Sequence, residues 1–115
     1  MTIRIATFNM ENLFRRPAVL GLQDVERRRR ILTDFAQDVM SHPSYKGLPG
    51  TFGECDSPRR KIDYLLLSPS LWSRVQHVGL ETRGIFAEGI KSFDSVKSKT
   101  TAASDHAALY ADLDL

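Results

Sequence analysis

The sequence is poor in the features that would assign it at once to a membrane, secreted or disulfide-rich class. It has no run near the roughly 18 consecutive apolar residues of a transmembrane helix. Its N-terminus lacks the charged, apolar and small-residue parts of a signal peptide, so we expect none. Its one cysteine, Cys55, cannot form a disulfide within the chain and favours a reducing compartment. We therefore expect a cytoplasmic protein.

An excess of one charge is also missing. The chain has 16 Lys and Arg residues against 14 Asp and Glu residues, a net charge of +2, which does not by itself indicate a nucleic-acid-binding protein. Zinc-ligand spacing is absent among His42, Cys55, His77 and His106. The sequence also lacks a Gly-x-Ser-x-Gly elbow and a phosphate-binding Gly-Lys-Ser/Thr loop.

Enough apolar sequence is present for one small domain. The 115 residues are 42% apolar, which is sufficient for a modest core, and we expect residues 1–115 to form a single domain. Alternating and β-rich apolar segments predict strands at residues 3–8, 62–67, 75–82 and 107–113. We expect the second and third of these strands to form a hairpin-like pair.

One main helix is predicted between the first two strands. Apolar residues at helical spacing indicate a helix over residues 24–40, with Asp24 as its N-cap. Residues 42–60 are rich in Gly and Pro, and residues 84–101 are rich in Lys, Ser and Thr, so both are predicted loops. The predicted fold is α/β, a mixed, mostly antiparallel sheet with one main helix packed on it.

Asp63 is the most informative polar residue, because it shares a predicted strand face with Leu65 and Leu67. A carboxylate there is costly unless it is hydrogen-bonded or paired. An imidazole is a natural partner, since the carboxylate fixes the ring tautomer and raises its basicity. His106 is the best candidate if the last strand lies next to the Asp63 strand. The alternative, that Asp63 caps a turn or pairs with a cation of residues 59–61, stays open.

Two further polar groups lie at predicted strand ends. Asn9 follows the first strand, and Asp105 stands beside His106 at the start of the last one. At the mouth of a strand, Asp105 could offer one carboxylate to a divalent cation. The alternative is a turn cap formed by Ser104 and Asp105.

Three stretches resemble conserved strands of the endonuclease/exonuclease/phosphatase superfamily. Residues 3–14 (IRIATFNMENLF) resemble its opening strand, residues 61–68 (KIDYLLLS) its penultimate conserved strand, and residues 103–113 (ASDHAALYADL) its closing Ser-Asp-His strand. They occur in the order of the family. The resemblance implies half of a DNase I-like four-layer α/β sandwich that keeps the first strand and lacks the central segment.

The resemblance also implies a role for each matching residue. Asn9 would bind the scissile phosphate or help to hold the metal environment, and Asp63 would orient His106. His106 would act as the general base on the attacking water or stabilise charge on the phosphate. Asp105 would contribute to a site for Mg²⁺ or Mn²⁺, which neutralises charge on the phosphoryl oxygens. Glu11 is the nearest other carboxylate for that cation.

The chain departs from the pattern of the family in three features. The metal-binding Glu of the family normally ends its second strand, and residues 22–24 (LQD) imitate that pattern. About ten residues after the first strand are too few for a parallel crossover, so Asp24 is better explained as a helix N-cap. The central Gly-Asp-x-Asn motif and the accompanying mid-chain His are absent.

Three functions remain open from the sequence. The resemblance implies a Mg- or Mn-dependent phosphodiesterase or nuclease, acting on a phosphodiester such as nucleic acid. The missing motif favours a non-catalytic remnant that binds phosphate or a partner, because such groups act together. A third reading is a basic nucleic-acid-binding module that uses residues 27–30 with Lys91, Lys97 and Lys99. A half-sandwich would expose a sheet face, so we also expect self-association as a homodimer.

Overall fold

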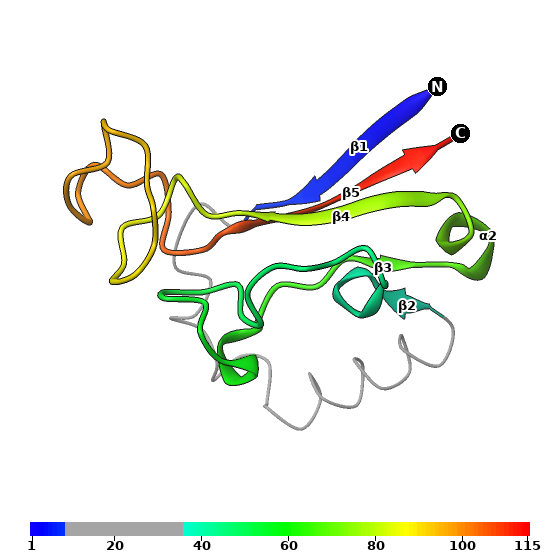
Figure 1. Ribbon diagram of the computed structural model, residues 1–115, viewed down its shortest axis with the longest axis horizontal. Coiled ribbons are helices and arrows are strands. Elements are labelled where there is room, and N and C mark those ends of the chain that lie inside the picture. Colours follow the sequence, from blue (N-terminus) through cyan, green and yellow to red (C-terminus); the bar gives the residue numbers. More distant parts are fainter. Residues whose placement is uncertain (9–35) are drawn as a thin grey trace, which may run out of the picture.

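A computed structural model of the chain describes residues 1–8 and 36–115, and these form two small antiparallel sheets that face each other (Figure 1). The larger sheet has the strand order β1-β5-β4, and the smaller one pairs β2 with β3. The fold is thus a compact, mixed α/β-like domain. Both described sheets are antiparallel, which agrees with the predicted mostly antiparallel pairing. Within the described ranges the one α-helix is short: α2, Pro69–Trp72.

The larger sheet contains three of the four predicted strands. Its strands are β1 (Thr2–Thr7), β4 (Val75–Glu81) and β5 (Ala108–Asp114). β5 is central and antiparallel to both neighbours, with Thr2 opposite Asp114 and Thr7 opposite Leu109. Side chains alternate between the two faces of a strand, so Leu109, Ala111 and Leu113 are buried while the residues between them face away.

The smaller sheet covers the apolar face of the larger one. It pairs β2 (Gln37–Asp38) with β3 (Leu66–Leu67). Val39 and Leu67 of this layer pack against Val78 and the apolar face of β5 in one buried cluster. Burying each such side chain contributes on the order of 1.5–3 kcal/mol, so this apolar contact holds the two layers together.

The predicted strand over residues 62–67 is wrong for most of its length, because only Leu66 and Leu67 are in a strand. The N–H groups of Ile62 and Asp63 donate to the hydroxyl of Thr51 and not to a neighbouring strand. The predicted pairing with residues 75–82 is also wrong, since β3 pairs with β2 and β4 pairs with β5.

The predicted helix is wrong at its C-terminal end. Gln37 and Asp38 form β2, and Val39–Ser41 form a 3-10 turn. Asp38 caps that turn by accepting the Met40 N–H at 3.0 Å, and its carboxylate also pairs with Lys61. The rest of the predicted helix, residues 24–35, lies outside the described residues. The same holds for the basic residues 27–30.

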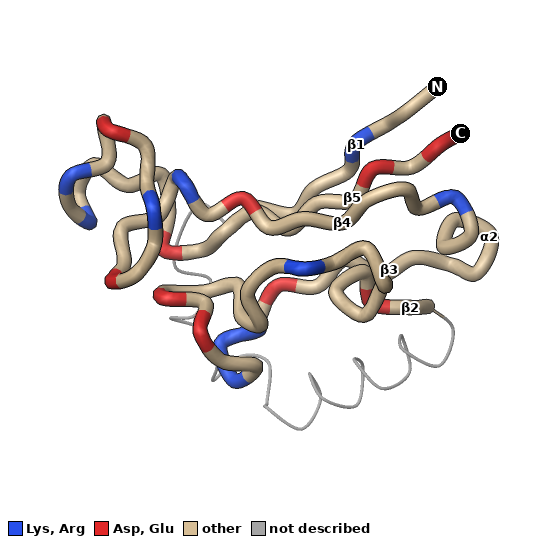
Figure 2. The backbone as a smooth tube through the Cα atoms, viewed as in Figure 1, with Lys and Arg blue, Asp and Glu red and all other residues tan. Residues whose placement is uncertain are grey.

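The face of the larger sheet turned away from the core carries charged residues of β1 and β5. Figure 2 shows a basic residue in β1 and acidic residues in β5. The Arg4 guanidinium donates to both carboxylate oxygens of Asp112, at 2.7 and 2.9 Å, and lies 4.2 Å from the centre of the Tyr110 ring. The hydrogen bonds from Arg4 lower the pKa of Asp112. No helix in the part of the chain that the structure describes is long and apolar enough to cross a membrane.

Candidate active site

The centre of the candidate site is a buried pair of side chains, Asp63 and His106. His106 Nδ1 lies 2.7 Å from Asp63 Oδ2, and the two side chains are only 1% and 8% exposed. A carboxylate can only accept, so Nδ1 is the protonated nitrogen of the ring. In the neutral imidazole the lone pair is then on Nε2, the nitrogen directed away from Asp63. The contact that the sequence suggested is present in the structure.

The strand arrangement that brings Asp63 and His106 together differs from the predicted one. The pairing was predicted on the condition that the last strand lies next to the Asp63 strand, but β5 has β1 and β4 as its neighbours. Asp63 instead precedes β3 in the smaller layer, and His106 precedes β5 in the larger one. The pair therefore bridges the two layers. None of the cations of residues 59–61 takes the place of His106 in this contact.

The loop over residues 50–53 holds the His106 segment from one side. Phe52 and His106 form an antiparallel bridge. The Ala107 N–H donates to the Thr51 carbonyl at 2.8 Å, and the Gly53 N–H donates to the Asp105 carbonyl at 2.9 Å. The Phe52 ring also meets the imidazole edge-on, at 5.3 Å between centres. The imidazole is thus fixed by main-chain pairing and by an aromatic neighbour.

Four buried polar residues surround this point: Thr51, Asp63, Ser104 and His106. Buried polar groups are costly unless they are hydrogen-bonded, and these are linked to one another or to the main chain. The Ser104 hydroxyl accepts the His106 N–H at 3.0 Å, and the Thr51 hydroxyl accepts the Asp63 N–H at 3.1 Å. Ser104 therefore acts as a cap, as the turn alternative predicted, while leaving Asp105 directed outward.

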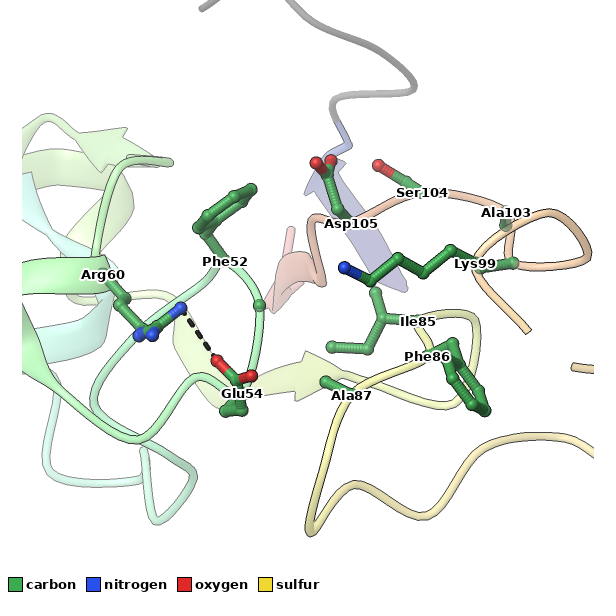
Figure 3. Close-up of a pocket in the computed structure, with 12 residues that line it drawn as sticks. Phe52, Glu54, Arg60, Ile85, Phe86, Ala87, Lys99, Ala103, Ser104 and Asp105 are labelled. Atoms are coloured by element: carbon green, nitrogen blue, oxygen red, sulfur yellow. Dashed lines mark ion pairs between the residues drawn. The ribbon is translucent and has the colours of Figure 1, made fainter. Parts of the chain in front are cut away.

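Asp105 lies between the buried pair and solvent. Its side chain is 55% exposed, and its Oδ1 lies 3.8 Å from His106 Nε2. Figure 3 shows it at the edge of a cleft beside Ser104. The cleft has a volume of about 360 Å³. A carboxylate in this place is available to a ligand in the cleft.

The cleft lies between two loops. One wall is the loop that carries Phe52 and Glu54, with Arg60 behind it, and the other comes from residues 85–87 and 99–105. Arg60 donates to Glu54 at 2.8 Å in an exposed ion pair, which contributes about 0–1 kcal/mol. Lys99 extends from the second wall into the space between Asp105 and Ile85 (Figure 3). The lining thus combines charged groups of both signs with apolar surface.

Cys55 lies buried behind the first wall, at 0% exposure. Burial raises the pKa of the Cys55 thiol to about 11, so the thiol is protonated near neutral pH. The thiolate is the nucleophilic and metal-binding form of cysteine. Cys55 therefore acts as a small apolar core residue in this fold.

The predicted metal ligands are only partly covered by the structure. Asn9 and Glu11 lie outside the described residues, so their roles stay predictions. Over residues 1–8 and 36–115, no three His, Cys, Asp or Glu side chains gather closely enough to hold a metal ion. Mg²⁺ is often bound by one or two carboxylates together with waters and substrate phosphates. Asp105 fits one carboxylate of such a site.

Sequence reasoning missed Thr51 and Phe52. Both lie in the Gly- and Pro-rich loop over residues 42–60, where no periodic pattern marks a residue as buried. The length of the loop was the available signal, because long loops in compact domains are usually functional or disordered. No known protein family, curated protein or solved structure matches the chain.

Proposed function

We propose that this protein is a metal-dependent phosphodiester hydrolase of the nuclease type, with an incomplete form of the active site of the endonuclease/exonuclease/phosphatase superfamily. The observation that carries the proposal is the 2.7 Å contact between His106 Nδ1 and Asp63 Oδ2 in a buried setting beside a cleft. A histidine oriented by a carboxylate is a general base suited to neutral pH. The motifs that carry the family resemblance supply both members of this pair.

The chemistry follows from the two nitrogens of the imidazole. Nε2 would accept a proton from a water whose oxygen attacks the phosphorus atom, and Asp63 would stabilise the resulting imidazolium through Nδ1–H. The P–O bond to the leaving group would break as the new P–O bond forms, and the imidazolium would give its proton to the leaving alkoxide or to solvent. Asp105 lines the cleft, and its Oδ1 lies 3.8 Å from Nε2, which is buried behind the cleft lining. It would hold Mg²⁺ or Mn²⁺ together with the phosphate and with Asn9 or Glu11. The cation, when bound, supplies positive charge to the phosphoryl oxygens.

The arrangement of the layers supports the family assignment. β1 ends at Thr7, opposite Leu109 of β5, and therefore at the same end of the sheet as His106. The first and last family-like motifs are thus adjacent strands, and the middle motif lies in the facing layer. We assign the two facing sheets to the two inner layers of a DNase I-like four-layer sandwich, of which this chain contains half.

The test is hydrolysis of single-stranded DNA, RNA and a chromogenic phosphodiester with Mg²⁺ or Mn²⁺, and with a chelator. We expect metal-dependent activity that is lost in His106→Ala and in Asp63→Asn. His77→Ala is the matched control, because His77 is an exposed histidine of β4 that lies outside the cleft. Equal activity in the wild type and in His106→Ala, purified in parallel, rules out the proposal.

The second candidate is a non-catalytic remnant that binds phosphate or a partner. The missing Gly-Asp-x-Asn motif favours it, because the remaining groups lose most of their effect when one member of a catalytic unit is removed. Titration with millimolar Mg²⁺, followed by NMR, separates the two candidates. Shifts centred on Asn9, Asp105 and His106 favour the enzyme, and the absence of site-specific shifts favours the remnant.

A further inference from the structure

Thr51 is a fully buried residue that is hydrogen-bonded to the segments of both members of the candidate pair. It is 0% exposed and lies in the loop over residues 50–53. Its main-chain N–H donates to the Arg60 carbonyl at 3.0 Å, and its carbonyl accepts the Ala107 N–H at 2.8 Å. Arg60 leads into the Asp63 segment, and Ala107 follows His106. Thr51 therefore stands between the two segments.

The Thr51 hydroxyl adds a second connection to Asp63. Its oxygen accepts the N–H groups of Ile62 and Asp63, both at 3.1 Å. A hydroxyl has two acceptor lone pairs and one donor hydrogen, so both lone pairs are used, and the hydrogen is directed to the Arg60 carbonyl at 3.4 Å. The Thr51 side chain thus accepts hydrogen bonds from two consecutive amides, as the carbonyl groups of a neighbouring strand would do in a sheet.

This connection matters because, within the residues that the structure describes, no strand pairing joins the Asp63 segment to the His106 segment. β3 and β5 belong to different sheets, and the two side chains are 43 residues apart in the chain. Hydrogen bonding between a histidine and its carboxylate depends on distances within a few tenths of an ångström. A residue that is bonded to both main-chain segments is placed to set that distance.

We propose that Thr51 is a positioning residue for the Asp63–His106 pair, with its hydroxyl setting the Asp63 main chain and its carbonyl setting the His106 main chain. Its effect on hydrolysis rests on the proposed function. Its effect on the geometry of the pair does not, because the pair exists in the folded protein whether or not it is catalytic.

The test compares Thr51→Val, which has nearly the same shape but no hydroxyl, with Thr51→Ser, which keeps the hydroxyl and loses the methyl group. NMR of the full-length protein labelled with ¹⁵N at its histidines reports the Nδ1–H proton of His106 and the ring tautomer. The signals are assigned by their loss in His106→Gln. Ser44→Ala is the matched control, because the Ser44 hydroxyl also accepts a main-chain N–H, that of Val78 at 3.0 Å.

In Thr51→Val we expect the His106 Nδ1–H signal to be lost or shifted and faster hydrogen exchange at the amides of Ile62 and Asp63. Thr51→Ser is expected to restore all of these signals, and Ser44→Ala to leave them unchanged. If the protein is an active hydrolase, kcat/KM in Thr51→Val should fall by up to about 100-fold, as for other displaced catalytic groups, and should recover in Thr51→Ser.

Wild-type His106 signals in a folded Thr51→Val overturn the proposal. If Thr51→Val does not fold, the test rests on Thr51→Ser. A folded Thr51→Ser variant that has lost the Nδ1–H signal would show that the methyl group, and not the hydroxyl, positions the pair, and would overturn the proposal. An inactive wild type with the expected NMR changes would refute the proposed function and leave the role of Thr51 intact.

Discussion

Asp63 and His106 are 43 residues apart in the chain, and Asp63 Oδ2 lies 2.7 Å from His106 Nδ1. Both side chains are almost fully buried, so neither can exchange its partner for water. A buried carboxylate is tolerated here because the imidazole of His106 is paired with it. This mutual dependence makes the pair a sensitive point for stability as well as for the proposed chemistry.

His106→Ala should lower the free energy of unfolding more than Asp63→Asn does. His106→Ala leaves the Asp63 carboxylate buried without the imidazole, and breaking a buried pair in this way costs roughly 3–5 kcal/mol. Asp63→Asn removes the charge and leaves an amide that can still hydrogen-bond, so its cost should be smaller. Urea unfolding of the wild type and both variants measures the difference. A His106→Ala variant as stable as Asp63→Asn would contradict the buried geometry.

Lys99 should contribute to substrate binding if the cleft holds a phosphodiester. Its side chain extends into the cleft beside Asp105, so Lys99→Gln should raise KM with little change in kcat and should weaken the dependence of KM on salt. Lys97→Gln is the control, because Lys97 is exposed on the same loop and does not line the cleft. Equal KM values for the two variants would show that Lys99 does not contribute to substrate binding.

Stability should fall as the pH rises from 9 to 11. Burial raises the pKa of the Cys55 thiol from 9.0 to about 11 and that of Tyr45 from 10.0 to about 12. Above pH 9 the unfolded chain releases the thiol proton while the folded chain retains it. Deprotonation therefore stabilises the unfolded state relative to the folded state, and the free energy of unfolding falls. Thermal unfolding at pH 7 to 11 measures this loss of stability. Cys55→Ala should reduce the slope between pH 9 and 11, and an identical slope in this variant would exclude Cys55 as the cause.

Self-association as a homodimer remains a prediction. In the described residues β1 has β5 as its one neighbour, and a strand at the edge of a sheet presents main-chain groups that can pair with another chain. The polar outer face, with Arg4 and Asp112, makes pairing along this edge more favourable than stacking of that face. Light scattering at high micromolar concentration should give twice the 13.0 kDa mass of the chain. A mass of one chain at that concentration would contradict the prediction.

The strands that sequence patterning predicted correctly are those whose signal is local. The segment at the end of the chain alternates apolar and other residues, and Leu109, Ala111 and Leu113 are buried as that alternation requires. Patterning failed at residues 62–67, where an apolar run suggested a strand. Ile62 and Asp63 are bonded instead to Thr51, a residue that no period could identify.

The predicted helix failed at its end for a related reason. Residues 36–40 continue the apolar spacing of the segment before them, yet Gln37 and Asp38 pair with Leu67 and Leu66. Pairing with a distant segment replaced the local helical preference, because Val39 is buried against β4 and β5 in this arrangement. Helical spacing describes a local preference and cannot report such a partner.

The sequence by itself determined which residues could do chemistry, and the alternation that sets the buried face of β1 and β5, because both are encoded in neighbouring residues. Only the tertiary structure decided that Asp63 and His106 meet across two layers. That meeting depends on main-chain hydrogen bonds from a loop without periodicity, centred on Thr51, and on apolar packing between Val39, Leu67 and the sheet. Such contacts depend on the positions of distant segments in space and not on the order of residues within any one of them.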